Sequence, residues 1–75
     1  MSRHVDIILK DIIAYIQVND YISICSNIEI LKLCVPELND VLGDAYDASR
    51  SHDKQELITE MLKFKYLYFR TMQIH

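Results

Sequence analysis

The chain has very few of the residues that build turns and loops, because its 75 residues include one glycine and one proline. A single glycine excludes a glycine-rich phosphate-binding loop, which needs several glycines close together. Cysteine is also scarce: there are two, whereas a small secreted protein held by disulfides carries at least about four. We therefore expect Cys25 and Cys34 to be buried, reduced thiols of a cytoplasmic protein.

Long uncharged runs are missing as well, since the longest cover only residues 12–19 and 21–28. A membrane-spanning helix needs about 20 consecutive apolar residues. Asp6, Lys10 and Asp11 interrupt the apolar stretch that an N-terminal export signal would need. The net charge of −3 provides no general attraction to nucleic acids or anionic membranes. The sequence thus predicts a cytoplasmic protein without a membrane partner.

No group of residues has the spacing of a catalytic or metal site. His4, His52 and His75 are scattered between the termini and a loop. Cys25 and Cys34 lack CxxC spacing, and no histidine lies near them in sequence. We expect no catalytic, cofactor-binding or metal-binding residue and no small-molecule substrate. The protein is predicted not to be an enzyme.

Apolar residues, by contrast, are abundant and make up 51% of the chain. The chain is predicted to form one helical domain over residues 1–75. So short a chain has a high ratio of surface to volume and cannot easily bury all of its apolar residues. Apolar surface that remains after folding usually marks a binding site for a partner. The sequence therefore predicts a protein that buries one of its faces against another chain.

The fold class expected from apolar spacing is all-α, a small bundle of three to four short helices at about 3–18, 27–34, 36–48 and 53–73. In the first helix, apolar residues recur every three or four positions from Val5 to Ile16. Ile7 and Ile13 lie off this stripe and indicate a second apolar edge.

Residues 21–35 are ambiguous, because β-branched residues are dense and partly alternate with other residues. A short hairpin over 21–33, turning at Ser26 and Asn27, is one interpretation. The favoured one is a helix over 27–34, since Ser26 and Glu29 have the spacing of a capping box.

The last two helices have clearer start signals. Pro36 suits the first turn of a helix, because it has no amide hydrogen to leave unpaired. Gly43 within that helix indicates close approach by another helix, and Asp53 and Glu56 have capping-box spacing at the start of the last one. Apolar residues cover more than half the circumference of the last helix, which predicts one internal contact and one contact with a partner.

The candidate partner-binding residues lie in residues 61–72 of this last helix, where aromatic and basic side chains are mixed without an acid. Large aromatic side chains often dominate binding energy, and basic ones orient a partner. The predicted set is Phe64, Tyr68, Phe69, Met72, Lys63, Lys65 and Arg70. A second candidate is an acidic face on the third helix that could dock a basic partner, formed by Glu37, Asp40, Asp44 and Asp47.

The function predicted from these features is a non-enzymatic module for protein–protein interaction, such as an adaptor, a chaperone-like protein or an inhibitor. Its expected partner is a second copy of itself, another protein, or both. The alternative is a transcriptional regulator with a degenerate helix-turn-helix, or an acidic DNA mimic that modulates a DNA-binding protein. Direct nucleic-acid binding is disfavoured, because the candidate recognition helix is acidic and would repel phosphates.

Overall fold

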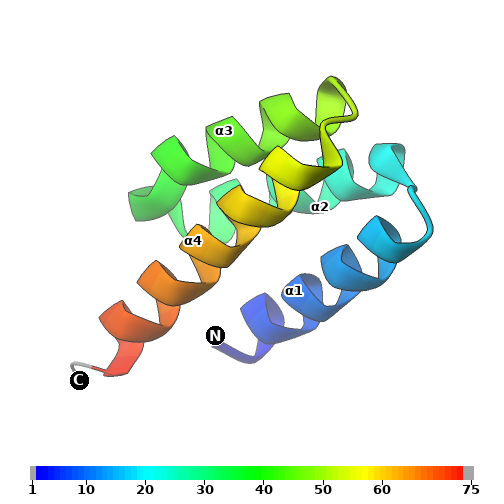
Figure 1. Ribbon diagram of the computed structural model, residues 1–75. Helices are drawn as coiled ribbons and strands as arrows, with labels where there is room; N and C mark the ends of the chain where they lie inside the picture. The colour runs from blue at the N-terminus through cyan, green and yellow to red at the C-terminus, as the bar shows by residue number, and fades with distance from the viewer. Residues whose placement is uncertain (1, 74–75) are drawn as a thin grey trace.

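The computed structural model describes the backbone of residues 2–73 and the side chains of residues 4–71. Over these residues it contains four α-helices, one 3₁₀ turn and no strand, which confirms the predicted all-α bundle (Figure 1). The elements are α1 (Ser2–Gln17), α2 (Tyr21–Cys34), η1 (Pro36–Leu38), α3 (Asn39–Arg50) and α4 (Lys54–Gln73). None of the described helices is long and apolar enough to cross a bilayer.

Helix α1 buries one stripe at the spacing that the sequence predicts. Its core side chains are Val5, Leu9, Ile12 and Ile16. The helix ends at Gln17, and Asn19 then adopts a left-handed conformation with φ of 59°. Asparagine tolerates this conformation better than most residues, because its short side chain can bond locally to the backbone. The chain therefore turns within three residues and starts α2.

Helix α2 corrects the prediction for residues 21–35, since the hairpin is absent and the helix begins six residues earlier than expected. Asp20 is the actual N-cap: its carboxylate accepts hydrogen bonds from the Ser23 amide at 3.2 Å and from the Ser23 hydroxyl at 2.8 Å. Ser26 is not a cap, because its hydroxyl donates to the Ile22 carbonyl one turn back. Helical spacing of the buried Ile24, Ile28 and Leu31 overrides the β-propensity of this segment.

Pro36 does open a helical turn, the 3₁₀ turn η1, which leads directly into α3. Gly43 in α3 contradicts the expectation of close helix approach. A Cβ atom added at Gly43 would find no neighbouring atom within 4 Å. The glycine therefore lies beside open space, and no packing contact in the described chain requires it.

The expected start of α4 is confirmed by its cap. The Glu56 amide donates to the Asp53 carboxylate at 3.1 Å. His52, just before the cap, has φ of 58° and stacks on the Tyr21 ring with centroids 4.3 Å apart. This contact ties the loop before α4 to the start of α2.

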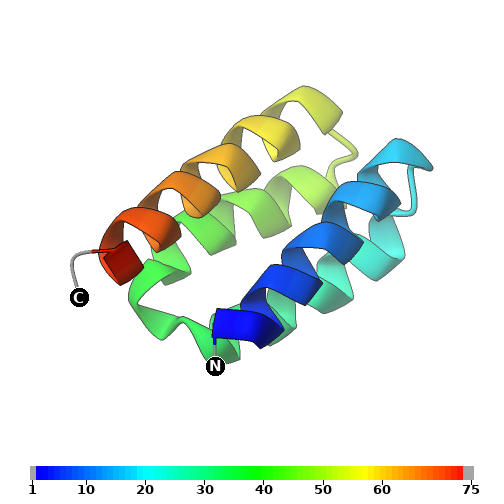
Figure 2. The ribbon, with the colours of Figure 1, turned by 90° about the horizontal axis from the view of Figure 1, so that it is seen from below.

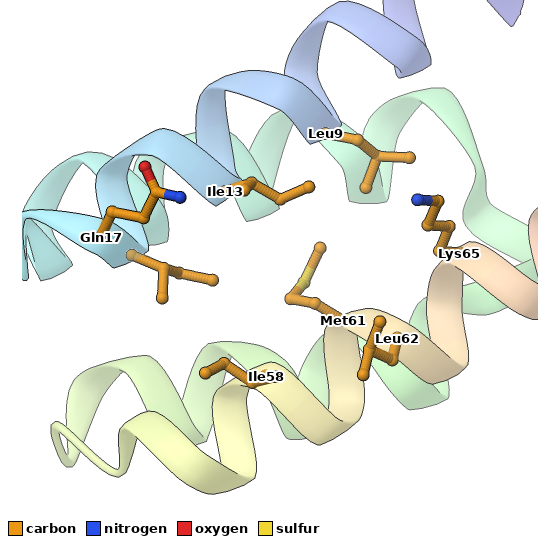
Figure 3. A pocket seen from close by; sticks show the side chains of 8 residues that line it. Leu9, Ile13, Gln17, Ile58, Met61, Leu62 and Lys65 are labelled. Atoms are coloured by element: carbon orange, nitrogen blue, oxygen red, sulfur yellow. The ribbon is translucent and has the colours of Figure 1, made fainter.

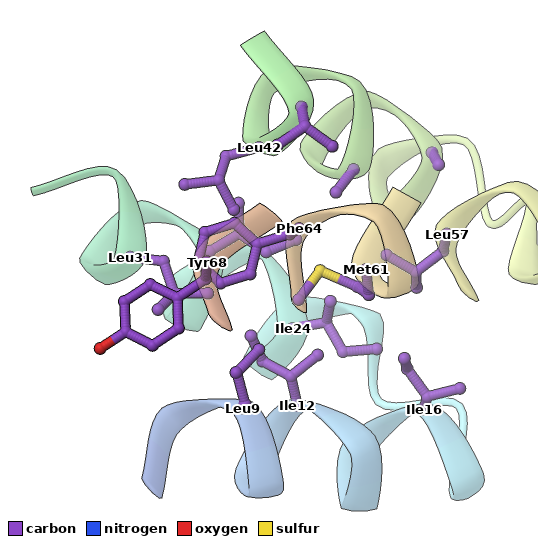
Figure 4. Packing of buried hydrophobic residues seen from close by; sticks show 14 of the residues in the cluster. Leu9, Ile12, Ile16, Ile24, Leu31, Leu42, Leu57, Met61, Phe64 and Tyr68 are labelled. Atoms are coloured by element: carbon purple, nitrogen blue, oxygen red, sulfur yellow. The ribbon is translucent and has the colours of Figure 1, made fainter. Parts of the chain in front are cut away.

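All four helices contribute to one hydrophobic core (Figure 4). Helix α2 packs against both α1 and α3, and α3 packs against α4. The backbones of α1 and α4 come close to each other at almost no point, although the two helices run antiparallel on the same side of the molecule (Figure 2). The bundle is therefore closed on three sides and open along the fourth.

The two cysteines are free, but they differ in exposure. Cys25 is half-buried, and its thiol donates to the Ser49 hydroxyl at 3.2 Å; that hydroxyl donates in turn to the Tyr21 carbonyl at 3.2 Å. Cys34 is exposed, which corrects the expectation that both thiols are buried. It is the last residue of α2, at the point where the chain leaves the helix.

Candidate functional site

The open side of the bundle holds an apolar groove between α1 and α4, with a volume of about 320 Å³ (Figure 3). We call it the α1/α4 groove. It is lined by Leu9, Ile13, Ile16, Gln17, Ile58, Met61, Leu62 and Lys65. Six of these eight side chains are apolar, so the groove presents hydrocarbon to the solvent.

The groove has a buried floor and exposed walls. Leu9, Ile16 and Met61 form the floor and belong to the core. Ile13 on α1 and Ile58 and Leu62 on α4 remain 46%, 39% and 60% exposed. Because the floor is packed from below, the groove is held open by the same contacts that stabilise the fold.

Polar side chains lie only at the ends of the groove. In Figure 3, Gln17 of α1 marks one end and Lys65 of α4 the other. The Lys65 ammonium group can orient an acidic or carbonyl group of an occupant, while its aliphatic stem covers apolar surface. This arrangement of apolar walls with a few polar end groups is typical of binding grooves.

The structure places the predicted aromatic anchors largely in the core. Phe64 and Tyr68 are buried, and their rings stack with centroids 5.9 Å apart. Phe69 is half-buried and meets Tyr68 edge-on at 5.6 Å. The side chain of Met72 lies outside the described residues. Phe64 and Tyr68 thus support the fold and offer no surface to a partner.

The predicted basic residues do not gather on one face. Lys63 and Arg70 are seven positions apart, so they share one side of α4, whereas Lys65 lies nearly opposite, in the groove. Lys63 forms an ion pair with Glu60, with 3.2 Å between its Nζ and the carboxylate Oε2. The structure therefore brings only Lys65 to the α1/α4 groove.

The predicted acidic face is present on the outer side of η1 and α3. Glu37, Asp40, Asp44 and Asp47 are all exposed. The single ion pair found among the described side chains is that of Lys63 and Glu60, so these four carboxylates lack a basic partner there. They form a solvated acidic surface away from the groove.

Glu60 is a feature that sequence reasoning missed. It is only 3% exposed, and its Oε1 has no hydrogen-bond partner among the described residues. Desolvation, together with the nearby carboxylates of Glu60 and Asp53, raises the pKa of Glu56, one turn earlier on the same helix.

Nothing in the described part of the chain resembles a metal centre, since no three side chains of His, Cys, Asp or Glu lie together there. Comparison with known proteins gives no match to a family model, a curated protein or a solved structure. The function must therefore be argued from the geometry of this chain.

The groove residues did leave a signal in the sequence. Ile13 lies off the main stripe of α1, and Ile58 and Leu62 widen the apolar surface of α4. We instead predicted Phe64 and Tyr68 as partner-binding residues, because large aromatic side chains often dominate binding energy. Periodicity does not distinguish the side of a wide stripe that packs inward from the side that stays exposed.

Proposed function

We propose that this protein is a non-enzymatic helical binding module that holds an apolar face of another polypeptide in the α1/α4 groove. The observation that carries the proposal is the apolar groove itself, with Ile13, Ile58 and Leu62 exposed on its walls. Exposed apolar surface in a concave site is costly in water and is a common mark of a protein-binding site.

The shape of the groove favours a helix as the bound element. Its walls are Leu9 to Gln17 on α1 and Ile58 to Lys65 on α4, and each spans about 10–12 Å at 1.5 Å per residue. Two antiparallel helices whose backbones stay apart can hold a third element between them. An amphipathic helix contributes apolar side chains every three or four residues, which matches a groove two turns long.

The test uses a hydrophobic fluorescent dye and one pair of matched variants. We expect the purified chain to bind the dye, and Leu62→Glu to reduce the bound fluorescence several-fold by placing a charge on the groove wall. Leu33→Glu is the control, because Leu33 is also exposed, at 84%, but lies on α2 away from the groove. Equal dye binding by both variants and the unchanged chain would contradict the proposal.

The nucleic-acid alternative gains no support from the arrangement of charges. The exposed surface of α3, the candidate recognition helix, carries Asp40, Asp44 and Asp47. Lys65 is separated from Lys63 and Arg70 by the width of α4. Phosphate binding needs several cations on one face, and no such face is formed by these residues.

A further inference from the structure

We propose that the occupant of the α1/α4 groove is an acidic amphipathic helix of another protein, with acidic side chains at both ends of a two-turn apolar stripe. This inference rests on the proposed function, because it names the chemistry of the polypeptide that the groove holds. The charges around the groove and the shape of its walls carry it.

Three lysines surround the groove on the two helices that form its walls. Lys65 on α4 lines the groove itself. Lys10 lies three residues before Ile13, so the two share the groove side of α1. Lys54 lies four residues before Ile58 and in the same way shares the groove side of α4.

The lysines lie at both ends of the groove. In Figure 3, Leu9 and Lys65 lie at one end, and Lys10 directly follows Leu9 in the chain. Ile58 lies toward the other end, and Lys54 is one turn beyond it. Lys54 and Lys65 are eleven residues apart, which corresponds to about 16 Å along α4. Positive charge therefore flanks the apolar walls on both sides.

Acids are scarce on this side of the molecule. Among the described residues of α1 and α4, the acid on the groove side is Asp6, seven residues before Ile13, and it is half-buried. The acidic face lies on η1 and α3, neither of which lines the groove. The three lysines are exposed, and none forms an ion pair with another described side chain. A basic surround of this kind on a chain of net charge −3 is complementary to an acidic partner.

The concave shape favours a helix over a flat lipid surface or a nucleic acid. The floor of Leu9, Ile16 and Met61 lies below the exposed walls that include Ile13 and Leu62. A helix is a rod that can contact the floor and both walls at once, whereas a flat bilayer meets only the wall tops. The lining residues include no aromatic ring, so the groove offers no stacking surface to unpaired bases.

The spacing along the groove defines the occupant further. Its walls accept apolar side chains spaced three or four residues apart over two turns. Acidic side chains about one turn outside that stripe reach Lys54 at one end, and Lys10 and Lys65 at the other. A helix of about 14 residues is long enough to carry both features.

The experiment compares two synthetic peptides of about 14 residues with the same leucine stripe. One has glutamates at both ends of the stripe and the other has lysines. Fluorescence anisotropy measures their binding to the full chain at several salt concentrations. We expect the acidic peptide to bind about tenfold more tightly at low salt, and the difference to shrink as salt screens the charges. Equal affinity, a preference for the basic peptide, or no binding of either overturns the inference.

Charge-reversal variants locate the binding on the molecule. We expect Lys65→Glu to weaken binding of the acidic peptide about fivefold or more, and Lys65→Gln to weaken it less. Arg70→Glu is the control, because it makes the same change in net charge at an exposed position on the other side of α4. Its effect should stay below about twofold. Circular dichroism verifies that the variants remain helical, and an equal loss in Lys65→Glu and Arg70→Glu would contradict the proposed site.

Further measurements separate this inference from other partners and from the proposed function. Binding of the chain to vesicles of phosphatidylserine and phosphatidylcholine, or displacement of the acidic peptide by a single-stranded oligonucleotide, would reveal a different partner and overturn the inference. If dye binding depends on Leu62 but the two peptides bind equally, the acidic partner fails and the groove proposal stands. If dye binding does not depend on Leu62, both fall.

Discussion

Glu60 is the residue whose surroundings fit its chemistry least. One carboxylate oxygen pairs with Lys63, but the other is buried without a partner. A buried polar atom that lacks a hydrogen bond costs about 1–3 kcal/mol. The Lys63 side chain is 60% exposed, so its ion pair with Glu60 is not fully buried. The stabilisation from this pair therefore offsets little of the cost of the unpaired oxygen.

Replacement of Glu60 should therefore stabilise the chain. We expect Glu60→Met, which keeps the length of the side chain, to raise the free energy of unfolding by about 1–3 kcal/mol. It also removes a carboxylate that raises the pKa of Glu56. Urea unfolding followed by circular dichroism measures the change. Glu56→Met on the exposed surface of the same helix is the control and should change stability little; a destabilised Glu60→Met would show that the carboxylate has a partner.

At the level of the elements, helix starts were predictable wherever a cap lies next to a clear apolar stripe. Asp53 and Pro36 are such cases, and both act as expected. The start of α2 was placed too late, because Asp20, which caps this helix, can equally end the helix before it. A single Asp is compatible with either role. The choice depends on Ile24 and Ile28, which are buried only because α2 packs against two other helices.

Helix α3 contains a glycine that the fold does not use. Gly43 has helical backbone dihedrals and open space where a Cβ atom would lie. We expect Gly43→Ala to raise the free energy of unfolding by about 0.5–1 kcal/mol, because alanine loses less backbone freedom on folding. Thermal or urea unfolding tests this. Ala14→Gly on the exposed surface of α1 is the reverse control and should lower stability by a similar amount; a loss of stability in Gly43→Ala would contradict the open space seen at this position.

At the scale of the whole molecule, Tyr68 on α4 is influenced by charged groups on two other helices. Its ring lies in the core on α4, and burial raises the pKa of its phenol, with the charges of Asp6 on α1 and Cys34 on α2 adding to the effect. Because the folded chain then holds its proton more tightly than the unfolded chain, this contribution to stability is complete below pH 10 and is lost as pH rises through the folded pKa.

We therefore expect the unfolding free energy to fall as pH rises above about 10, and part of that fall to disappear in Tyr68→Phe. Phenylalanine keeps the ring in the core and removes the ionisable hydroxyl. The measurement is urea unfolding at a series of alkaline pH values. Tyr66→Phe, at an exposed position on the same helix, is the control. An identical pH profile for Tyr68→Phe and the unchanged chain would contradict the role of burial.

The sequence by itself determined the helical class, most helix boundaries and the presence of leftover apolar surface. These properties depend on local spacing and composition. Ten large apolar side chains do remain exposed among the described residues. Only the tertiary structure decided which of them line a groove. Phe64 and Leu62 are two residues apart on one helix, yet one is buried and the other is 60% exposed, because α3 and η1 pack against one side of α4 and α1 stays apart from the other.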